Sequence, residues 1–240
     1  MRRCERAVVA VLVALSLGVA ILAIGEAQQP FRIGASLAQT GPYAVPAQSQ
    51  RRGYQLCVKH VNEKGGVLGR RLELIVEDDQ SKAPAAVAIY EKRITHDKVD
   101  AILGPYGSSQ WEAELVTLRA GGLIPIARQY PGASNFVESY RKEFPGAELS
   151  YHSAAGYGSC QVLVEAIRRA GSPEREKVRD VILTMDRNTV FGAFKVDRDG
   201  LQIAHKMVMF PWQDGKKVIV WPEELAPGHP RFPTPPWSQR

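Results

Sequence analysis

Cysteine is scarce in this chain, which has only 3 cysteines among its 240 residues. Such a low count excludes the small scaffolds that disulfides hold together. Cys4 lies at the start of the chain, which leaves Cys57 and Cys160 for the folded part. Each of these two lies on the apolar stripe of an expected helix. Buried free thiols are therefore the favoured state, and a disulfide between them is the alternative for an exported protein.

A concentration of charge of one sign is also missing. The chain has 31 Lys and Arg against 25 Asp and Glu, which gives a net charge of +6. Its basic pairs are scattered and have acids nearby, at residues 51–52, 70–71, 168–169 and 216–217. Nucleic-acid-binding proteins gather their basic residues into one stripe, so no nucleic-acid partner is expected.

The familiar motifs of catalysis and metal binding do not occur in the sequence. It has no P-loop, HExxH, CxxC or GxSxG pattern, and no two histidines are four residues apart. The acids at residues 77–79 are expected to form a solvated edge or a helix cap, and residues 197–200 a hairpin turn, rather than metal sites. No general base can be identified for Ser108 or Ser109. We therefore expect no catalysis, no cofactor and no metal.

One long apolar run is present, from Ala7 to Ile24. It follows a short basic segment and precedes Gly25-Glu26-Ala27, a small-x-small site. This layout predicts a secretory signal peptide over residues 1–27, and an uncleaved N-terminal membrane anchor is the alternative. A periplasmic location is expected. No second run is long enough to span a bilayer.

Strand and helix patterns alternate after residue 30. Strands are expected over residues 31–38, 71–77, 99–103 and 123–127. Helices are expected between them, over residues 46–62, along the stripe Val87, Tyr90 and Ile94, and along the stripe Trp111, Leu115 and Leu118. This tight alternation predicts an α/β fold with half of a doubly wound parallel sheet, in which ligands bind beyond the carboxyl ends of the strands.

The second half of the chain has a different pattern. Helices are expected over residues 133–144 and 153–170, followed by a helix with Ser172 as N-cap and Pro173 at its first position. Apolar strands are expected over residues 191–196, 204–210 and 217–221, joined by tight turns at Asp-Gly pairs. The chain thus divides into an α/β lobe at residues 28–129, C-terminal helices and a hairpin at 130–225, and a proline-rich tail at 226–240.

Candidate binding residues follow the expected strands. Ser108 and Ser109 open an expected helix, where hydroxyl and free backbone N–H groups suit a carboxylate; pure helix capping is the alternative. Tyr43 and Tyr106 are candidates for an aromatic wall, with loop packing as the alternative.

Four motifs in this order carry a family resemblance. They are Thr40-Gly41-Pro42-Tyr43, NEKGGVLGR at residues 62–70, EDDQS at 77–81 and LGPYGSS at 103–109. Together they resemble the leucine/isoleucine/valine-type periplasmic binding proteins, and residues 136–140, 189–192, 212–217 and 220–222 resemble the C-terminal third of that family. The resemblance implies a type I fold of two lobes. It also implies an exported protein of an ABC importer that binds an amino acid, an amide or a similar solute without catalysis and delivers it to a membrane permease.

The resemblance also implies site residues. The hydroxyl that matches Ser108 holds the ammonium or carboxylate group of the ligand in the family. Tyr106 and Gly107 line the same place, and residues 40–43 form the rim.

One departure from the family concerns the second lobe. The chain runs from the fourth expected strand almost directly into the helix at residue 133, so a gap on the order of 100–150 residues falls near Gln129-Tyr130. An internal deletion, a fault in the gene assignment or a one-lobed relative would each produce this pattern. The alternative function is therefore a one-lobed remnant or interaction protein, which no longer binds solute tightly and associates with itself through the surface left by the missing lobe.

Overall fold

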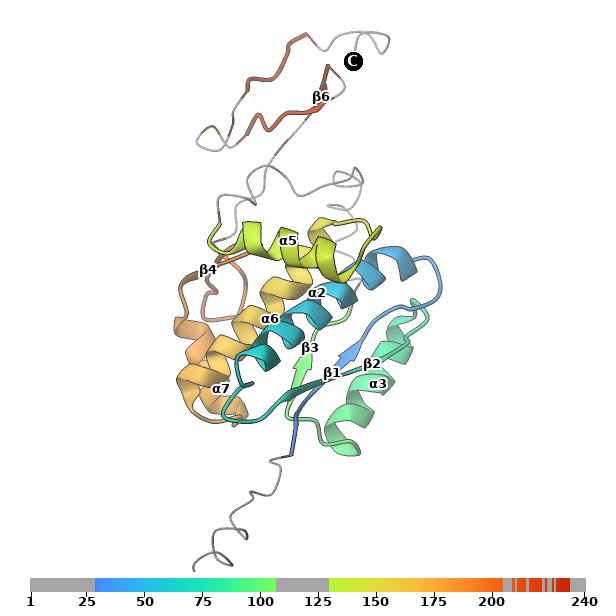
Figure 1. Cartoon of the computed structure of the whole chain (residues 1–240), viewed down its shortest axis with the longest axis vertical. Helices are drawn as coiled ribbons and strands as arrows, with labels where there is room; N and C mark the ends of the chain where they lie inside the picture. The colour runs from blue at the N-terminus through green and yellow to red at the C-terminus, as the bar shows by residue number, and fades with distance from the viewer. Residues whose placement is uncertain are drawn as a thin grey trace, which may run out of the picture.

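The structure, a computed structural model, describes residues 29–106, 130–204 and parts of 209–233 (Figure 1). The expected signal peptide, the helix around Leu115 and the strand at 123–127 lie outside the described residues. In chain order the elements are β1 (Phe31–Ser36), α2 (Ala44–Glu63), β2 (Leu72–Glu77), α3 (Ala83–Thr95), β3 (Ala101–Leu103), α5 (Ala133–Glu143), α6 (Tyr151–Ala170), α7 (Arg175–Thr184), β4 (Arg187–Thr189), β5 (Gly192–Phe194), β6 (Trp212–Gln213) and β7 (Lys216–Lys217).

The first three strands form a parallel sheet in the order β2-β1-β3. In the register of this sheet, Ile33 of β1 is opposite Leu74 of β2 and Ala101 of β3. The central strand is the most buried, with Phe31, Ile33 and Ala35 fully enclosed. Figure 1 shows α3 on one side of the sheet and α2, followed by α6, on the other. This arrangement confirms the α/β class and the parallel crossovers, because each parallel connection requires a helix that crosses a face of the sheet.

Helices α2 and α6 pack side by side at very short range. A Cβ atom on Gly53 would lie 2.1 Å from the carbonyl oxygen of Ser153, and one on Gly156 would lie 2.4 Å from that of Gln50. Only glycine fits at these two positions, because any side chain would overlap the backbone of the facing helix.

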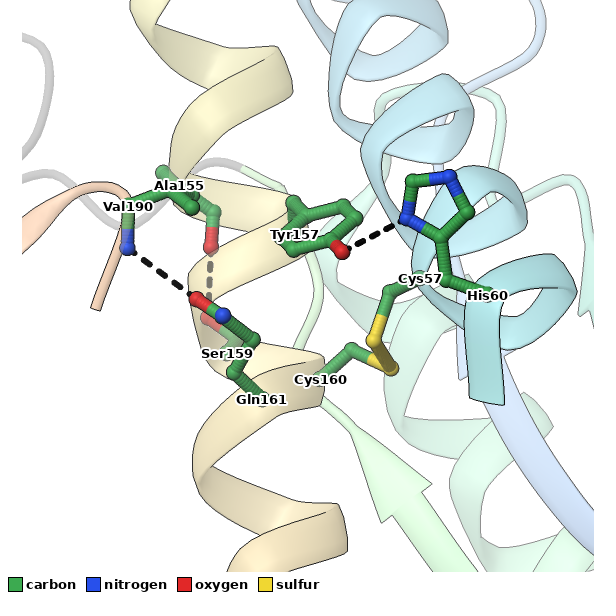
Figure 2. Close-up of a disulfide and its surroundings, with 8 residues drawn as sticks. All are labelled: Cys57, His60, Ala155, Tyr157, Ser159, Cys160, Gln161 and Val190. Carbon is green, nitrogen blue, oxygen red and sulfur yellow. Dashed lines mark hydrogen bonds between the residues drawn. A yellow bond between two sulfur atoms is a disulfide. The ribbon is translucent and has the colours of Figure 1, made fainter. Parts of the chain in front are cut away.

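This close approach also brings two cysteines together. Cys57 of α2 and Cys160 of α6 form a disulfide with a Cα–Cα distance of 6.2 Å (Figure 2). The expectation of free thiols is therefore wrong, although both residues lie on buried helix faces as expected. Burial alone does not distinguish a free thiol from a paired one, since the distance between two helices is a tertiary property.

Helix α3 presents a different face to the sheet than its apolar residues suggest. Val87 and Ile94 are 58% and 39% exposed, whereas Ile89 and Arg93 are buried. The Arg93 guanidinium bonds to Glu77 at 2.8 Å and to Asp97 at 2.5 Å. These two carboxylates neutralise the buried charge while the stem of Arg93 packs near Gly34, so an arginine occupies a core-facing position.

The start of α7 also differs from the expectation. The helix begins at Arg175 with Glu174 as N-cap, so Ser172 is not the cap and Pro173 is not in the helix. Instead the Glu174 N–H donates to Ser172 Oγ at 3.1 Å. The Ser-Pro pair therefore closes a turn before the helix, because a serine hydroxyl can accept from the backbone two residues later in either setting.

Two of the three expected C-terminal strands are shorter than expected, and most of the third, at residues 204–210, lies outside the described residues. The expected strand at 191–196 is reduced to β5, which pairs antiparallel with β4, a strand that the sequence analysis did not predict. Thr189 Oγ1 accepts from the N–H groups of Phe191 at 3.1 Å and Gly192 at 3.2 Å, which fastens the connecting turn. The turn at 197–200 is confirmed by a bond from Gly200 N to Asp197 O at 3.0 Å. The turn that starts at Asp214, between β6 and β7, is confirmed as well.

Candidate functional site

The loops after β1 and β2 meet at Asp78, at the carboxyl edge of the sheet. Its carboxylate accepts from Gln39 N at 2.7 Å, Thr40 N at 3.2 Å, Gln80 N at 2.8 Å and Thr40 Oγ1 at 2.8 Å. Burial raises the pKa of Asp78, but these hydrogen bonds together outweigh burial and hold the pKa below its usual value. Asp78 therefore fixes the shape of two loops as a charged acceptor.

Asp79 also holds these loops in place, from a buried position beneath them. It is 3% exposed and accepts from Ser36 Oγ at 2.8 Å and Ser81 N at 2.9 Å. Ser81 Oγ in turn accepts from Tyr43 N at 3.1 Å and donates to Thr40 O at 2.9 Å. The expectation of a solvated edge or helix cap is thus wrong for Asp79, whose buried carboxylate is satisfied by Ser36 at the end of β1 and by Ser81 of the loop after β2.

The end of β3 is held by two tyrosine hydroxyls. Tyr54 donates to Gly104 O at 3.1 Å, and Tyr90 donates to Leu103 O at 2.9 Å. Burial raises the pKa of both phenols, to about 12 for Tyr90. Both hydroxyls therefore remain donors at neutral pH, and they direct the chain toward Tyr106.

Five aromatic side chains form a continuous series at this edge, which we call the ring row. Its members, in order of contact, are Tyr43, Tyr106, His152, Tyr151 and Phe191. The distances between successive ring centroids are 5.9, 5.1, 3.9 and 6.3 Å. Burial lowers the pKa of His152 to about 4, so its ring is neutral at pH 7.

The ring row contains two of the predicted site residues, and the structure brings them together. Tyr43 is the N-cap of α2, and Tyr106 follows β3. The sequence analysis missed Tyr151, His152 and Phe191. A signal for Tyr151 and His152 was present in the sequence, because this aromatic pair directly precedes the expected helix start at Ser153. Helix α6 in fact begins at Tyr151, two residues earlier than expected.

The other three predicted residues, Gly107, Ser108 and Ser109, lie outside the described residues, directly after Tyr106. Their roles stay predictions.

Arg51 of α2 adds a positive charge to this edge. Its Nη1 donates to Gln39 Oε1 at 2.7 Å, while its Nε is buried without an acceptor. No carboxylate among the described residues forms an ion pair with Arg51. An arginine whose charge is not neutralised attracts an anionic group to the loop after β1.

Among the described residues, no group of three or more His, Cys, Asp or Glu could hold a metal ion. No helix within residues 29–106 and 130–204 is both long and apolar enough to cross a membrane.

Sequence comparisons find one family and several curated relatives. A family model described as periplasmic binding protein matches residues 30–127 and 120–217. The chain is 30% identical over 107 residues to Leu/Ile/Val-binding protein homolog 7 of Brucella melitensis, covering 43% of this chain and 27% of that protein. It is 27% identical over 122 residues to homolog 1 of Brucella abortus, covering 49% of this chain and 32% of that protein. The chain thus spans about a third or less of the length of these relatives.

Comparison with solved structures supports the fold. The leucine-binding protein LivK of Thermotoga maritima aligns with a TM-score of 0.60 and 16% identity, over 78% of this chain and 97% of that chain. The branched-chain amino acid binding protein LivJ of Streptococcus pneumoniae, solved with isoleucine, aligns with a TM-score of 0.59 and 13% identity over the same shares of the two chains. At these identities the similarity establishes the type I fold, of which the described residues form part.

Proposed function

The chain belongs to the periplasmic binding protein family, and from this membership we propose that it is an exported solute-binding protein of an ABC importer. It binds an amino acid, an amide or a related small carboxylate without catalysis, and it delivers this solute to a membrane permease. The family match over residues 30–217 is the observation that carries the proposal. The names of the relatives, which are Leu/Ile/Val-binding proteins, support an amino acid as the solute.

The proposed site lies at the carboxyl edge of the sheet. Tyr43 and Tyr106, whose ring centroids are 5.9 Å apart, form its wall. Gly107, Ser108 and Ser109 provide backbone and hydroxyl groups for the polar end of the solute. The clamped loops around Asp78 support this assignment, because a site that is held in shape before binding loses less entropy when the solute arrives.

Arg51 is proposed as the partner of the solute carboxylate. Its guanidinium contacts the loop after β1 through Gln39, and no described carboxylate neutralises it. A charge-assisted hydrogen bond from arginine is roughly twice as strong as a neutral one. We therefore expect the carboxylate to lie near Gln39 and the rest of the solute to lie toward the two tyrosines.

Thermal unfolding of the purified exported chain with millimolar amino acids and amides tests this function. A solute that binds only the native state raises the unfolding midpoint by mass action. Ser108→Ala and Arg51→Gln should reduce the increase, whereas Arg52→Gln, which removes the same charge from the next residue of the same helix, should retain it. If no solute in the panel raises the midpoint, the proposed function is wrong.

A second candidate is the one-lobed interaction protein. The observation that favours it is a set of exposed apolar side chains in the described C-terminal part: Leu201 at 66%, Ile203 at 57%, Met209 at 61% and Trp221 at 53% exposure. Exposed apolar groups of this kind favour association. Sedimentation across a range of protein concentrations separates the two candidates, because self-association without any solute effect would support this one.

A further inference from the structure

Each of the two packed helices carries a glycine four residues before its cysteine. Helix α2 has Gly53 and Cys57, and helix α6 has Gly156 and Cys160, all of them buried. Residues four apart lie on the same face of a helix, so glycine and cysteine share the contact face in both helices. The glycines bring the two backbones together, because a Cβ on either would overlap the facing helix. The cysteines then meet one turn further along (Figure 2).

The folded lobe encloses both sulfur atoms. Cys57 is 2% exposed and Cys160 is 0% exposed. Beside the disulfide, His60 Nδ1 of α2 is hydrogen-bonded to Tyr157 Oη of α6 at 2.7 Å (Figure 2). Thiol–disulfide exchange requires direct attack by a thiolate on a sulfur atom. An oxidant therefore reaches the two cysteines only while α6 is not yet packed on α2.

The positions of the cysteines in the sequence leave a single pairing. Cys4 lies in the expected signal peptide, so the exported chain is expected to keep only Cys57 and Cys160. These two are 103 residues apart, and an exported chain crosses the membrane with its N-terminus first, so Cys57 is exported before Cys160. Because no alternative pairing exists, the chain requires an oxidant and no rearrangement of disulfides.

We propose that the exported chain is a substrate of a thiol–disulfide oxidoreductase, which oxidises Cys57 and Cys160 before α6 packs on α2. The Cys57 thiolate attacks the disulfide of the oxidoreductase, so that a mixed disulfide forms and one enzyme thiolate leaves. The Cys160 thiolate then attacks the sulfur of Cys57, which forms the native bond and releases the second enzyme thiolate. The two cysteines together lose two electrons and two protons, and the oxidoreductase is reduced to its dithiol.

Gly53 and Gly156 are positioning residues for the second step. Their contact places α6 beside α2, so Cys160 meets the mixed disulfide in a defined geometry instead of by random closure of a long loop. Holding two reacting groups in place raises the rate of the reaction between them. The packed helices afterwards shield the native bond from reductants.

Reduction of the exported chain tests whether the bond is shielded. The probe is reduced glutathione, with and without urea, and the free thiols are alkylated and counted by mass spectrometry. The bond should be reduced on the order of 10³-fold more slowly in the folded chain than in urea, because attack requires the rare open state. Similar rates in both conditions would overturn the proposal, because the packed helices would then admit an oxidant as well.

Reoxidation tests the second step. The reduced chain in urea is exposed to oxidised glutathione, either in urea or after dilution, and the mixed disulfide is trapped with acid and followed by mass. Conversion of the mixed disulfide to the native bond should be about tenfold or more faster after dilution, because the helix contact then positions Cys160. Equal rates would show that the helix contact plays no part in closing the bond.

A matched pair of glycine variants tests the positioning role. In Gly53→Ala the mixed disulfide should accumulate and close about tenfold more slowly. Gly104→Ala, where a Cβ meets nothing within 4 Å, should close at the natural rate. Equal rates in the two variants would contradict the role of the glycines. Thermal unfolding checks that each oxidised variant folds, and Gly156→Ala replaces Gly53→Ala if that variant does not.

A purified oxidoreductase with an oxidised Cys-x-x-Cys motif tests the partner class. It should oxidise the reduced chain as it is diluted from urea, and it should act more slowly on reduced chain that has already folded. If it leaves the thiols free while oxidised glutathione converts them, the partner class is wrong. The proposal rests on the export that the proposed function requires, but not on the solute. A chain that is oxidised as expected and binds no solute would therefore overturn only the proposed function.

Discussion

The contact between α2 and α6 and the carboxyl edge of the sheet involve the same two helices but are built differently. The helix contact relies on a few short-range features, namely Gly53, Gly156 and the Cys57–Cys160 disulfide. The carboxyl edge relies on many hydrogen bonds between loops and on partly exposed rings. Damage to the helix contact should therefore lower stability most, whereas damage to the edge should lower stability less and should also change binding.

Loss of the disulfide should have the largest effect on stability. Cys57 and Cys160 are 103 residues apart in the sequence. Cross-linking a loop of this length restricts the unfolded chain by on the order of 4 to 5 kcal/mol. We expect the double variant Cys57→Ala and Cys160→Ala to lose most of this amount from its free energy of unfolding in urea. An unchanged midpoint would show that the helix contact does not depend on the bond.

Gly53→Ala should have the next largest effect. The new Cβ would lie 2.1 Å from Ser153 O, so the two helices must separate. A loss of about 2 to 3 kcal/mol in the free energy of unfolding is expected. Gly104→Ala is the control, because a Cβ there meets nothing within 4 Å, and its effect should stay within about 0.5 kcal/mol. Equal losses in both variants would contradict the steric explanation.

Asp78→Asn tests the hydrogen bonds at the carboxyl edge of the sheet and should lower the free energy of unfolding by a moderate amount. We expect a loss of about 1 to 2 kcal/mol in the free energy of unfolding at pH 7, because charge-assisted hydrogen bonds weaken. The pKa of Asp78 is lowered in the folded chain, so its contribution is present above its ordinary value of 3.8 and is lost as the pH falls through the lower folded value. The variant should show a weaker pH dependence in this acidic range. Asp180→Asn, at an exposed ion pair, should change little.

His152 should have the smallest effect on stability at pH 7, and its contribution is visible as a pH dependence. Its pKa is lowered from 6.5 to about 4, so the unfolded chain binds a proton in this range that the folded chain does not. The free energy of unfolding should therefore fall as the pH decreases from about 6.5 to about 4. His152→Gln should reduce that slope, and part should remain because burial also lowers the pKa of His60. An unchanged slope would place His152 in a more solvated setting.

Much of the fold was predictable from local patterns. The expected helix at residues 133–144 is observed at Ala133–Glu143, and the expected strand at 71–77 is observed at Leu72–Glu77. Long periodic segments are predictable because their apolar faces repeat over several turns. The predicted inward stripe of α3 was wrong for Val87 and Ile94, because ion pairs with Glu77 and Asp97 allow Arg93 to be buried. Tyr90, the third residue of that stripe, does face the sheet. The bounds of β6 and β7 could not be predicted, because each strand spans only two residues and is too short for a periodic signal.

The candidate site was only partly predictable. Tyr43 and Tyr106 could be inferred because both follow parallel strands, whose carboxyl ends share one edge of the sheet. Tyr151 and Phe191 reach that edge through α6 and the turn after β4, and no local pattern indicates this.

Local sequence patterns were enough to establish the alternation of strands and helices, the parallel sheet and the family to which the chain belongs. Spacing, breakers and motif order encode these features within short stretches of chain. The bond between Cys57 and Cys160 and the row of five rings follow from the tertiary fold and not from any local pattern. Both depend on the distance between α6 and the N-terminal lobe, and that distance is determined by how closely whole helices pack.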